Sequence, residues 1–226
     1  MNAVGKKLVG VILGIAVLGV AIGLYISIWA TNFPKAVAAT PAAATIAEGG
    51  TNLTLETVAA SGKLAPEHPS WVSYAVRSHG QWVHSTIYTV PAYSLVHVTI
   101  YQFDSPTGLR NPFLSQVQGT VGGTMGVDGK TANTIPAEEA SHTFAIPQLG
   151  VFVPLPGVSE EAKHPCEEGP CEPSQFDHRT VTFTFRTGAP GRYHWQCFVP
   201  CGAGYYFGNG GPMQTLGYMD GFIDVV

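Results

Sequence analysis

The longest apolar stretch of the chain lies near its N-terminus, where residues 8 to 30 form a run of 23 residues without a charged side chain. At about 1.5 Å per residue, a helix of this length spans roughly 34 Å, enough to cross a bilayer. The apolar core of a secretory signal usually has about 7 to 15 residues, so we expect a transmembrane helix over 8–30 within an uncleaved membrane anchor, residues 1–30. Lys6 and Lys7 precede the helix, and the positive-inside rule therefore predicts that the rest of the chain lies on the outer face of the cell membrane.

Beyond residue 51 the pattern changes to short stretches in which apolar and polar residues alternate, as in half-buried strands. Residues 94–103 and 179–186 alternate most regularly, and residues 193–197 and 221–226 continue the pattern after Gly/Pro turns. No segment outside the anchor has helical periodicity. The pattern predicts an all-β sandwich over residues 51–226. In the first stretch, one face holds Leu95, His97, Thr99 and Tyr101, and the other holds Val96, Val98, Ile100 and Gln102. In the second stretch we expect Val181, Phe183 and Phe185 to face inward, with the threonines outward.

Two segments lack a strand pattern. Residues 31–50 are rich in Ala, Thr, Pro and Gly, and we expect a flexible linker there. Residues 104–140 contain Pro, Gly and polar residues with few strand signals. A loop of that length in a compact domain is usually functional or packed on a partner.

The composition and net charge of the chain argue against a nucleic-acid partner. The 226 residues carry a net charge of −4, and only 12% of them are charged. A nucleic-acid partner would require a basic face, so we expect no nucleic-acid binding. The 27 glycines and 17 prolines suit an all-β domain with many turns.

The four cysteines form two close pairs, and an outer-face location permits disulfides. Cys166 and Cys171 lie in a polar loop, where a disulfide is the favoured interpretation; a metal site that uses His164 is the alternative. The same loop is acidic, which is typical of a solvated surface, although it could also steer a basic redox partner. Its acidic residues are Glu160, Glu161, Glu167, Glu168 and Glu172.

The second pair, Cys197 and Cys201, follows an aromatic strand and lies in a tight Pro-containing loop, and His142 precedes it in the chain. Thiolate, imidazole and a weak thioether are the ligands of copper electron-transfer sites, so Met219 or Met213 would complete the set. Softness favours copper over magnesium or calcium, whereas zinc remains compatible with two cysteines and one histidine.

The segments 142–157 and 193–202 resemble the ligand loops of cytochrome c oxidase subunit II, and the resemblance covers roughly residues 85–226. It implies a Greek-key cupredoxin β-sandwich of the cupredoxin superfamily with a copper site. It also implies extracytoplasmic electron transfer within a membrane respiratory complex, beside integral-membrane subunits and a redox partner such as a cytochrome. The chain alone would not be an enzyme, because the oxygen-reducing centre would lie in another subunit.

The chain also departs from that family's ligand pattern. The positions of a second histidine and a methionine are Tyr205 and Gly208, and the histidine of mononuclear copper proteins is replaced by Gly202. The ligand set is therefore incomplete. Two further interpretations stay open: a metal-free structural subunit with a Cys197–Cys201 disulfide, and an extracytoplasmic protein that binds or delivers cuprous ion.

The remaining histidines are better explained as surface or hydrogen-bonded residues than as metal ligands. His194 is opposite in strand phase to Cys197, which indicates a surface position. His97 is expected to be a hydrogen-bonded strand histidine, and His79 and His84 are expected on the surface. The chain contains no phosphate-binding glycine loop, no serine nucleophile motif and no His-Glu-x2-His.

Overall fold

The computed structural model describes residues 3–31, 35–41, 49–66, 68–202 and 211–226. The chain separates into two compact units, Met1–Phe33 and Pro34–Val226. The first unit contains the long helix and the second contains all of the described strands.

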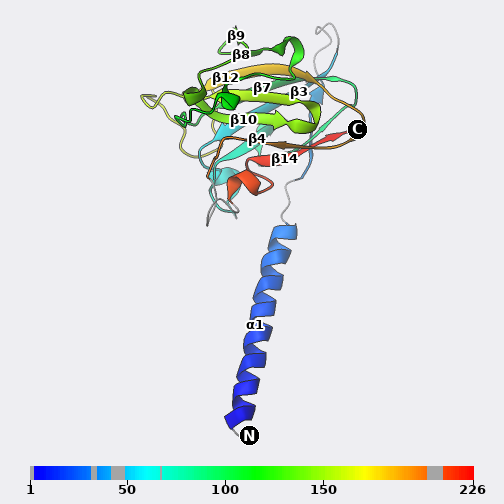
Figure 1. Ribbon diagram of the computed structural model, residues 1–226, viewed down its shortest axis with the longest axis vertical. Coiled ribbons are helices and arrows are strands. Elements are labelled where there is room, and N and C mark those ends of the chain that lie inside the picture. The colour runs from blue at the N-terminus through cyan, green and yellow to red at the C-terminus, as the bar shows by residue number, and fades with distance from the viewer. Residues whose placement is uncertain (1–2, 32–34, 42–48, 67, 203–210) are drawn as a thin grey trace. The chain divides into compact units, whose positions relative to one another are not determined.

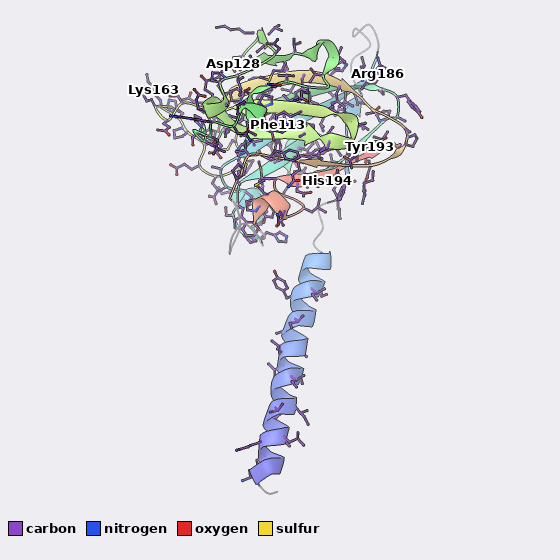
Figure 2. All side chains as sticks on the ribbon, in the orientation of Figure 1. Phe113, Asp128, Lys163, Arg186, Tyr193 and His194 are labelled. Atoms are coloured by element: carbon purple, nitrogen blue, oxygen red, sulfur yellow. A yellow bond between two sulfur atoms is a disulfide. The ribbon has the colours of Figure 1, made fainter. Side chains whose placement is uncertain are left out.

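Helix α1 spans Ala3–Thr31 and includes the apolar run predicted from the sequence. Its side chains stand out along the helix in Figure 2, and none of those in the apolar window of Gly5–Ser27 is buried. The helix is long and apolar enough to cross a membrane, a criterion that a signal sequence near an N-terminus also meets.

The second unit is built from two β-sheets (Figure 1). The first sheet contains, in spatial order, β1 (Val37–Ala38), β6 (Ile87–Val90), β14 (Asp220–Val225), β13 (Gly191–Gln196), β10 (Ala140–Ile146) and β11 (Val151–Pro156). The second contains β5 (Gln81–Val83), β4 (Ser73–Ser78), β3 (Thr51–Val58), β7 (Leu95–Gln102), β12 (Arg179–Arg186), β8 (Met125–Val127) and β9 (Lys130–Ala132), and β2 (Thr40–Pro41) pairs with β3.

The chain crosses repeatedly between the sheets. β10 and β11 form an antiparallel hairpin in the first sheet, β12 lies in the second, and β13 and β14 return to the first. Parallel pairs join β3 with β7 and β6 with β14. The predicted all-β sandwich with one apolar N-terminal helix is confirmed by this architecture, whereas the cupredoxin type stays a prediction.

The predicted strand phases agree with the structure. β7 and β12 pair along their whole length, and the three side chains predicted to face inward from β12 are buried. On β7 the buried face is the one that holds Val96, Val98, Ile100 and Gln102. Outside α1, the described helices are single 3₁₀ turns, in line with the missing helical periodicity. They are η1 (Gly62–Leu64), η2 (Pro112–Ser115), η3 (Val121–Gly123), η4 (Ala137–Glu139), η5 (Pro147–Leu149) and η6 (Pro212–Gln214).

The segments without a strand pattern are partly structured. Within the predicted linker, Val37–Ala38 pairs with β6 and Thr40–Pro41 pairs with β3. Within residues 104–140, the hairpin of β8 and β9 continues the second sheet beside β12. Tertiary pairing orders these short strands, because their own propensity is too weak to mark them in the sequence.

The core centres on Trp195 of β13, which is fully buried. Its ring lies 4.9 Å from Tyr74, 5.7 Å from Tyr88 and 5.2 Å from Phe144, measured between ring centroids. Its indole N–H donates to the carbonyl oxygen of Thr86 over 3.0 Å, so the large side chain is buried without an unmet donor. This cluster fixes the strand that leads into Cys197.

A second, smaller core lies under the loop that Cys166 and Cys171 close by a disulfide, which confirms the favoured interpretation of that pair. Both half-cystines are buried with Val58 and Phe103. Glu56 is also fully buried there, and it accepts a hydrogen bond from the backbone N–H of Cys171 over 3.1 Å. Burial raises the pKa of Glu56 to about 8, against the opposing effect of that hydrogen bond.

The pKa of Glu56 predicts how stability depends on pH. The folded-state pKa lies above the unfolded value, so the folded protein holds an extra proton between about pH 5 and 8 and loses stability as pH rises through that window. Across this window the wild type should lose on the order of 2–4 kcal/mol of its free energy of unfolding. We expect Glu56→Gln not to show this loss, because the amide cannot ionise. Thermal unfolding followed by near-UV circular dichroism from pH 5 to 9 measures it.

The exposed Glu160→Gln serves as the matched control and should leave the pH profile unchanged. A stability difference between wild type and Glu56→Gln that stays constant from pH 5 to 9 would contradict the prediction.

Candidate metal centre

His142 lies on β10 at a point where the strand is irregular. The register with β11 shifts between Ala140 and His142, as at a β-bulge, and such a bulge re-aims the side chains around it. The His142 side chain is buried, with only 2% of the residue exposed. It therefore faces the protein interior near the start of β10.

Cys197 directly follows β13 and is anchored on two sides. Its backbone N–H donates to the carbonyl oxygen of Met219 over 2.9 Å, which keeps the chain aligned with the start of β14. Thr143, the neighbour of His142, donates its backbone N–H to Cys197 Sγ over 3.4 Å. The hydroxyl oxygen of Thr143 also accepts the backbone N–H of Phe198 over 2.7 Å, so Thr143 ties the cysteine loop to β10.

The loop then turns back and brings Cys201 to the same place. The N–H of Cys201 donates to the carbonyl oxygen of Val199 over 2.7 Å, which closes a tight turn around Pro200. Both cysteines are buried and neither is in a disulfide. The alternative of a Cys197–Cys201 disulfide is thus not the state of this structure.

The three predicted ligands His142, Cys197 and Cys201 form one cluster. The Nδ1 atom of His142 lies 2.8 Å from Cys201 Sγ and 4.0 Å from Cys197 Sγ, and the two sulfurs lie 3.2 Å apart. In the part of the chain that the structure describes, this is the one group of at least three His, Cys, Asp or Glu residues with metal-binding spacing.

The spacing of these atoms suits a metal ion. His142 Nδ1 and the two sulfurs form a triangle with sides of 2.8, 3.2 and 4.0 Å. The point equidistant from the three atoms lies about 2.0 Å from each of them. Metal–nitrogen and metal–thiolate bonds are roughly 2.0 to 2.3 Å long. An ion close to the plane of the three donors therefore reaches all of them without rearrangement.

Asp104 is part of the same site, and the sequence analysis did not identify it. Its Oδ2 lies 3.1 Å from His142 Nε2, the ring nitrogen that faces away from the sulfurs. Asp104 follows β7 in the chain, 38 residues before His142. An acidic residue at the end of a buried strand was the available signal, but only the fold indicates which histidine it meets.

The cluster carries a defined charge without metal. Burial opposes ionisation of Cys197, but hydrogen bonds from Cys201 and His142 outweigh it and lower the pKa of Cys197 well below its usual value. The hydrogen bond to Cys197, with burial, raises the pKa of Cys201. The two sulfurs lie 3.2 Å apart and titrate as a pair that shares one negative charge.

His142 balances that charge. Burial alone would lower its pKa, but the hydrogen bonds to Asp104 and to the thiolate raise it to about 9. Burial would raise the pKa of Asp104, but His142 and the backbone N–H of Ser105 together hold it below its ordinary value. At neutral pH the site is a buried thiolate–imidazolium pair with an adjacent carboxylate.

The thioether ligands stay predictions. Met219 is fully buried beside Cys197, linked to it through the backbone hydrogen bond described above. Met213 is half-buried against the core, and its carbonyl oxygen accepts from Gln196 over 2.9 Å. Tyr205 and Gly208, at the positions of the family's remaining ligands, lie outside the described residues.

The other histidines do not join the cluster. His194, labelled in Figure 2, pairs with Asp220 over 2.8 Å, and His97 Nδ1 is 3.0 Å from the Thr184 hydroxyl. His79 is exposed as predicted, whereas His84 is half-buried against Tyr218, and its burial lowers its pKa to about 4. The expectation of a surface position for His84 was therefore wrong.

Aromatic rings surround the cysteine loop unevenly. Trp195 and Phe144 are fully buried on the core side. On the other side Phe198 is 41% exposed, and its ring lies 6.2 Å from Phe152, which in turn lies 4.5 Å from Phe113. The thiolates are thus enclosed by the core on one side and lie close to a partly exposed aromatic surface on the other.

The protonation state of the metal-free site predicts how many protons are released when a metal binds. Because the metal-free site holds one proton on His142 Nδ1 and one on the thiol pair, we expect a divalent ion to release about two protons at pH 7. Apparent affinity should rise by up to about 100-fold per pH unit below pH 8. Calorimetric titration with Zn²⁺ in buffers of different ionisation enthalpy measures the count.

In Cys201→Ser the thiol proton is missing, so proton release should fall by about one. If the wild-type site releases no proton, the assigned charge state is wrong.

No family model matches the chain, and no curated protein matches it. Among solved structures, the copper protein rusticyanin is similar at 14% identity and a TM-score of 0.33, with 91% of this chain and 94% of that chain covered. Rusticyanin from Thiobacillus ferrooxidans is similar at 16% identity and a TM-score of 0.31, with 78% of this chain and 77% of that chain covered. Similarity at this level identifies neither a metal nor a function for this chain. Both must be argued from the chain's own residues.

Proposed function

We propose that this chain is a membrane-anchored, extracytoplasmic cupredoxin that transfers electrons through a copper site formed by His142, Cys197 and Cys201. The observation that carries the proposal is the cluster of one imidazole nitrogen and two thiol sulfurs within 4.0 Å of one another. These groups come from segments 55 and 59 residues apart and meet in a buried position. Ligands held by a closed β-framework are suited to a site that changes oxidation state with little movement.

The donor chemistry supports copper. Two thiolates and an imidazole are soft to intermediate ligands, which bind copper well and magnesium or calcium poorly. Bound copper supplies one-electron redox chemistry. The chain's residues hold and insulate it: Thr143 donates to the Cys197 sulfur, and Trp195 and Phe144 exclude water on the core side.

The cellular setting is part of the same proposal. Helix α1 would anchor the chain, and Lys6 and Lys7 would keep its N-terminus on the cytoplasmic side. The resemblance to cytochrome c oxidase subunit II supports a place in a respiratory complex, next to integral-membrane subunits. The half-exposed Phe113 and Phe198 lie on the side of the site where a redox partner such as a cytochrome could approach.

The copper proposal predicts a spectroscopic result. After reduction of the thiols and loading with Cu²⁺, the purified full chain in detergent should bind copper in elemental analysis, show visible thiolate-to-copper absorption, and give an electron paramagnetic resonance spectrum. The hyperfine pattern separates one copper from two. Cys197→Ser should lose the absorption, because the thiolate most stabilised in the site is gone.

The exposed substitution Ser174→Ala is the control and should retain full copper binding. Wild-type protein that takes up no copper and shows no visible absorption would rule out the proposal and favour a metal-free structural subunit.

Copper delivery is a second candidate, favoured by the three-donor cluster. Two thiolates and one imidazole suit cuprous ion, which accepts few ligands. This candidate predicts tight cuprous binding without reversible oxidation of the bound ion. Cyclic voltammetry of the copper-loaded protein distinguishes it from electron transfer, for which we expect a reversible wave.

The anchor generates a separate prediction. The full chain should stay in the membrane fraction after a carbonate wash and keep its N-terminal residues, while added protease degrades the sandwich from the outer side of intact cells. Loss of the N-terminal 30 residues from the mature protein would instead identify α1 as a signal sequence.

A further inference from the structure

Asp104 lies where its carboxylate meets the far side of the His142 ring. The residue follows β7 by two positions, and its side chain is 26% exposed whereas that of His142 is 3% exposed. The two side chains meet through Oδ2 and Nε2 at 3.1 Å. The carboxylate therefore touches a candidate ligand without belonging to the cluster of donor atoms around the sulfurs.

The carboxylate of Asp104 is oriented by the surrounding backbone. Its second oxygen, Oδ1, accepts the N–H of Ser105 over 2.8 Å. The carbonyl oxygen of Asp104 accepts the N–H of Val158 over 2.9 Å, which ties this turn to the end of β11. Both carboxylate oxygens thus have a partner, and the direction of Oδ2 is fixed by the fold.

Gln102 holds the same turn from the interior. This side chain is fully buried; its amide N–H donates to the carbonyl oxygen of Asp104 over 2.8 Å, and its amide oxygen accepts the N–H of Asp104. The amide oxygen also accepts from the Thr57 hydroxyl over 3.0 Å. A buried amide with all of these partners makes the position of Asp104 rigid.

The pairing decides which ring nitrogen faces the sulfurs. When Nε2–H donates to Asp104, the neutral ring keeps its lone pair on Nδ1, the atom that lies 2.8 Å from Cys201 Sγ. A carboxylate on the distal nitrogen also makes the imidazole a stronger donor, as in carboxylate–histidine–metal arrangements.

We propose that Asp104 is a positioning residue of the metal site, which fixes His142 as an Nδ1 ligand and adds negative charge that favours the divalent, oxidised metal over the monovalent one. The inference rests on the proposed copper-binding function. Asp104 would not touch the metal and would act through His142 alone.

The experiment compares wild type with Asp104→Asn in the full-length chain in detergent. Asparagine keeps the shape and one acceptor oxygen but removes the charge. We expect affinity for Co²⁺, measured by competition with a chelator, to fall 10- to 100-fold. The affinity for Cu⁺ should fall less than the affinity for Cu²⁺, so the copper midpoint potential should rise by about 59 mV for each tenfold difference between the two losses.

Asp224→Asn is the matched control. Asp224 also forms a charge-assisted pair, with Arg192 at 2.6 and 2.7 Å, but at the end of β13 farthest from Cys197. The substitution Asp224→Asn removes the same unit of charge and should leave both the Co²⁺ affinity and the copper midpoint potential unchanged. Equal effects of the two variants would show that only net charge matters and would overturn the proposal.

A measurement on wild type covers the case in which Asp104→Asn does not fold. In the ¹⁵N-labelled, Zn²⁺-loaded protein, His142 should show a slowly exchanging proton on Nε2 and a metal-shifted Nδ1. Metal on Nε2 would overturn the inference while leaving metal binding intact. Absence of metal binding to the wild type would overturn the proposed function and the inference together.

Discussion

β10 and β13 lie next to each other in the first sheet, where Ala145 pairs with Gln196. This contact joins two segments about fifty residues apart in the chain, and the candidate site depends on it. His142 precedes the paired residue on one strand, and Cys197 follows it on the other. Because adjacent antiparallel strands run in opposite directions, a residue before the pair on β10 and one after it on β13 lie at the same end of the sheet.

The packing of the core makes that adjacency rigid. Trp195 is buried between rings of both sheets, and its indole nitrogen has a backbone acceptor, so β13 cannot slide relative to β6 and β14 without exposing the ring. A shift of one residue would turn Trp195 outward and Cys197 away from His142, since side chains alternate between the faces of a strand. The same packing that stabilises the sandwich thus sets the distance between the candidate ligands.

Buried polar groups in the sandwich help to select one arrangement of the loops around the site. Thr143 links β10 with both Cys197 and Phe198, and Gln102 holds the turn at Asp104 from within. A buried polar side chain is costly unless its partners are in place, so these groups favour one arrangement of the loops over others of similar packing. The thiolate, imidazolium and carboxylate alternate in charge, with the imidazolium between the two negative groups, and together they leave one net negative charge. In the proposed function, metal binding would exchange protons for a cation in a site that is already assembled.

Sequence patterns alone predicted the fold class, the apolar helix, the alternation in β7 and β12, and the three candidate ligands His142, Cys197 and Cys201. These features are local: alternation, run length and short motifs record them directly. The sequence did not reveal the role of Asp104, the burial of His84 and Glu56, or the short strands β1, β2, β8 and β9. Only the tertiary structure decided these, because each depends on a neighbour brought in from a distant segment. A carboxylate after a strand resembles any turn residue until the fold places a histidine 3.1 Å away.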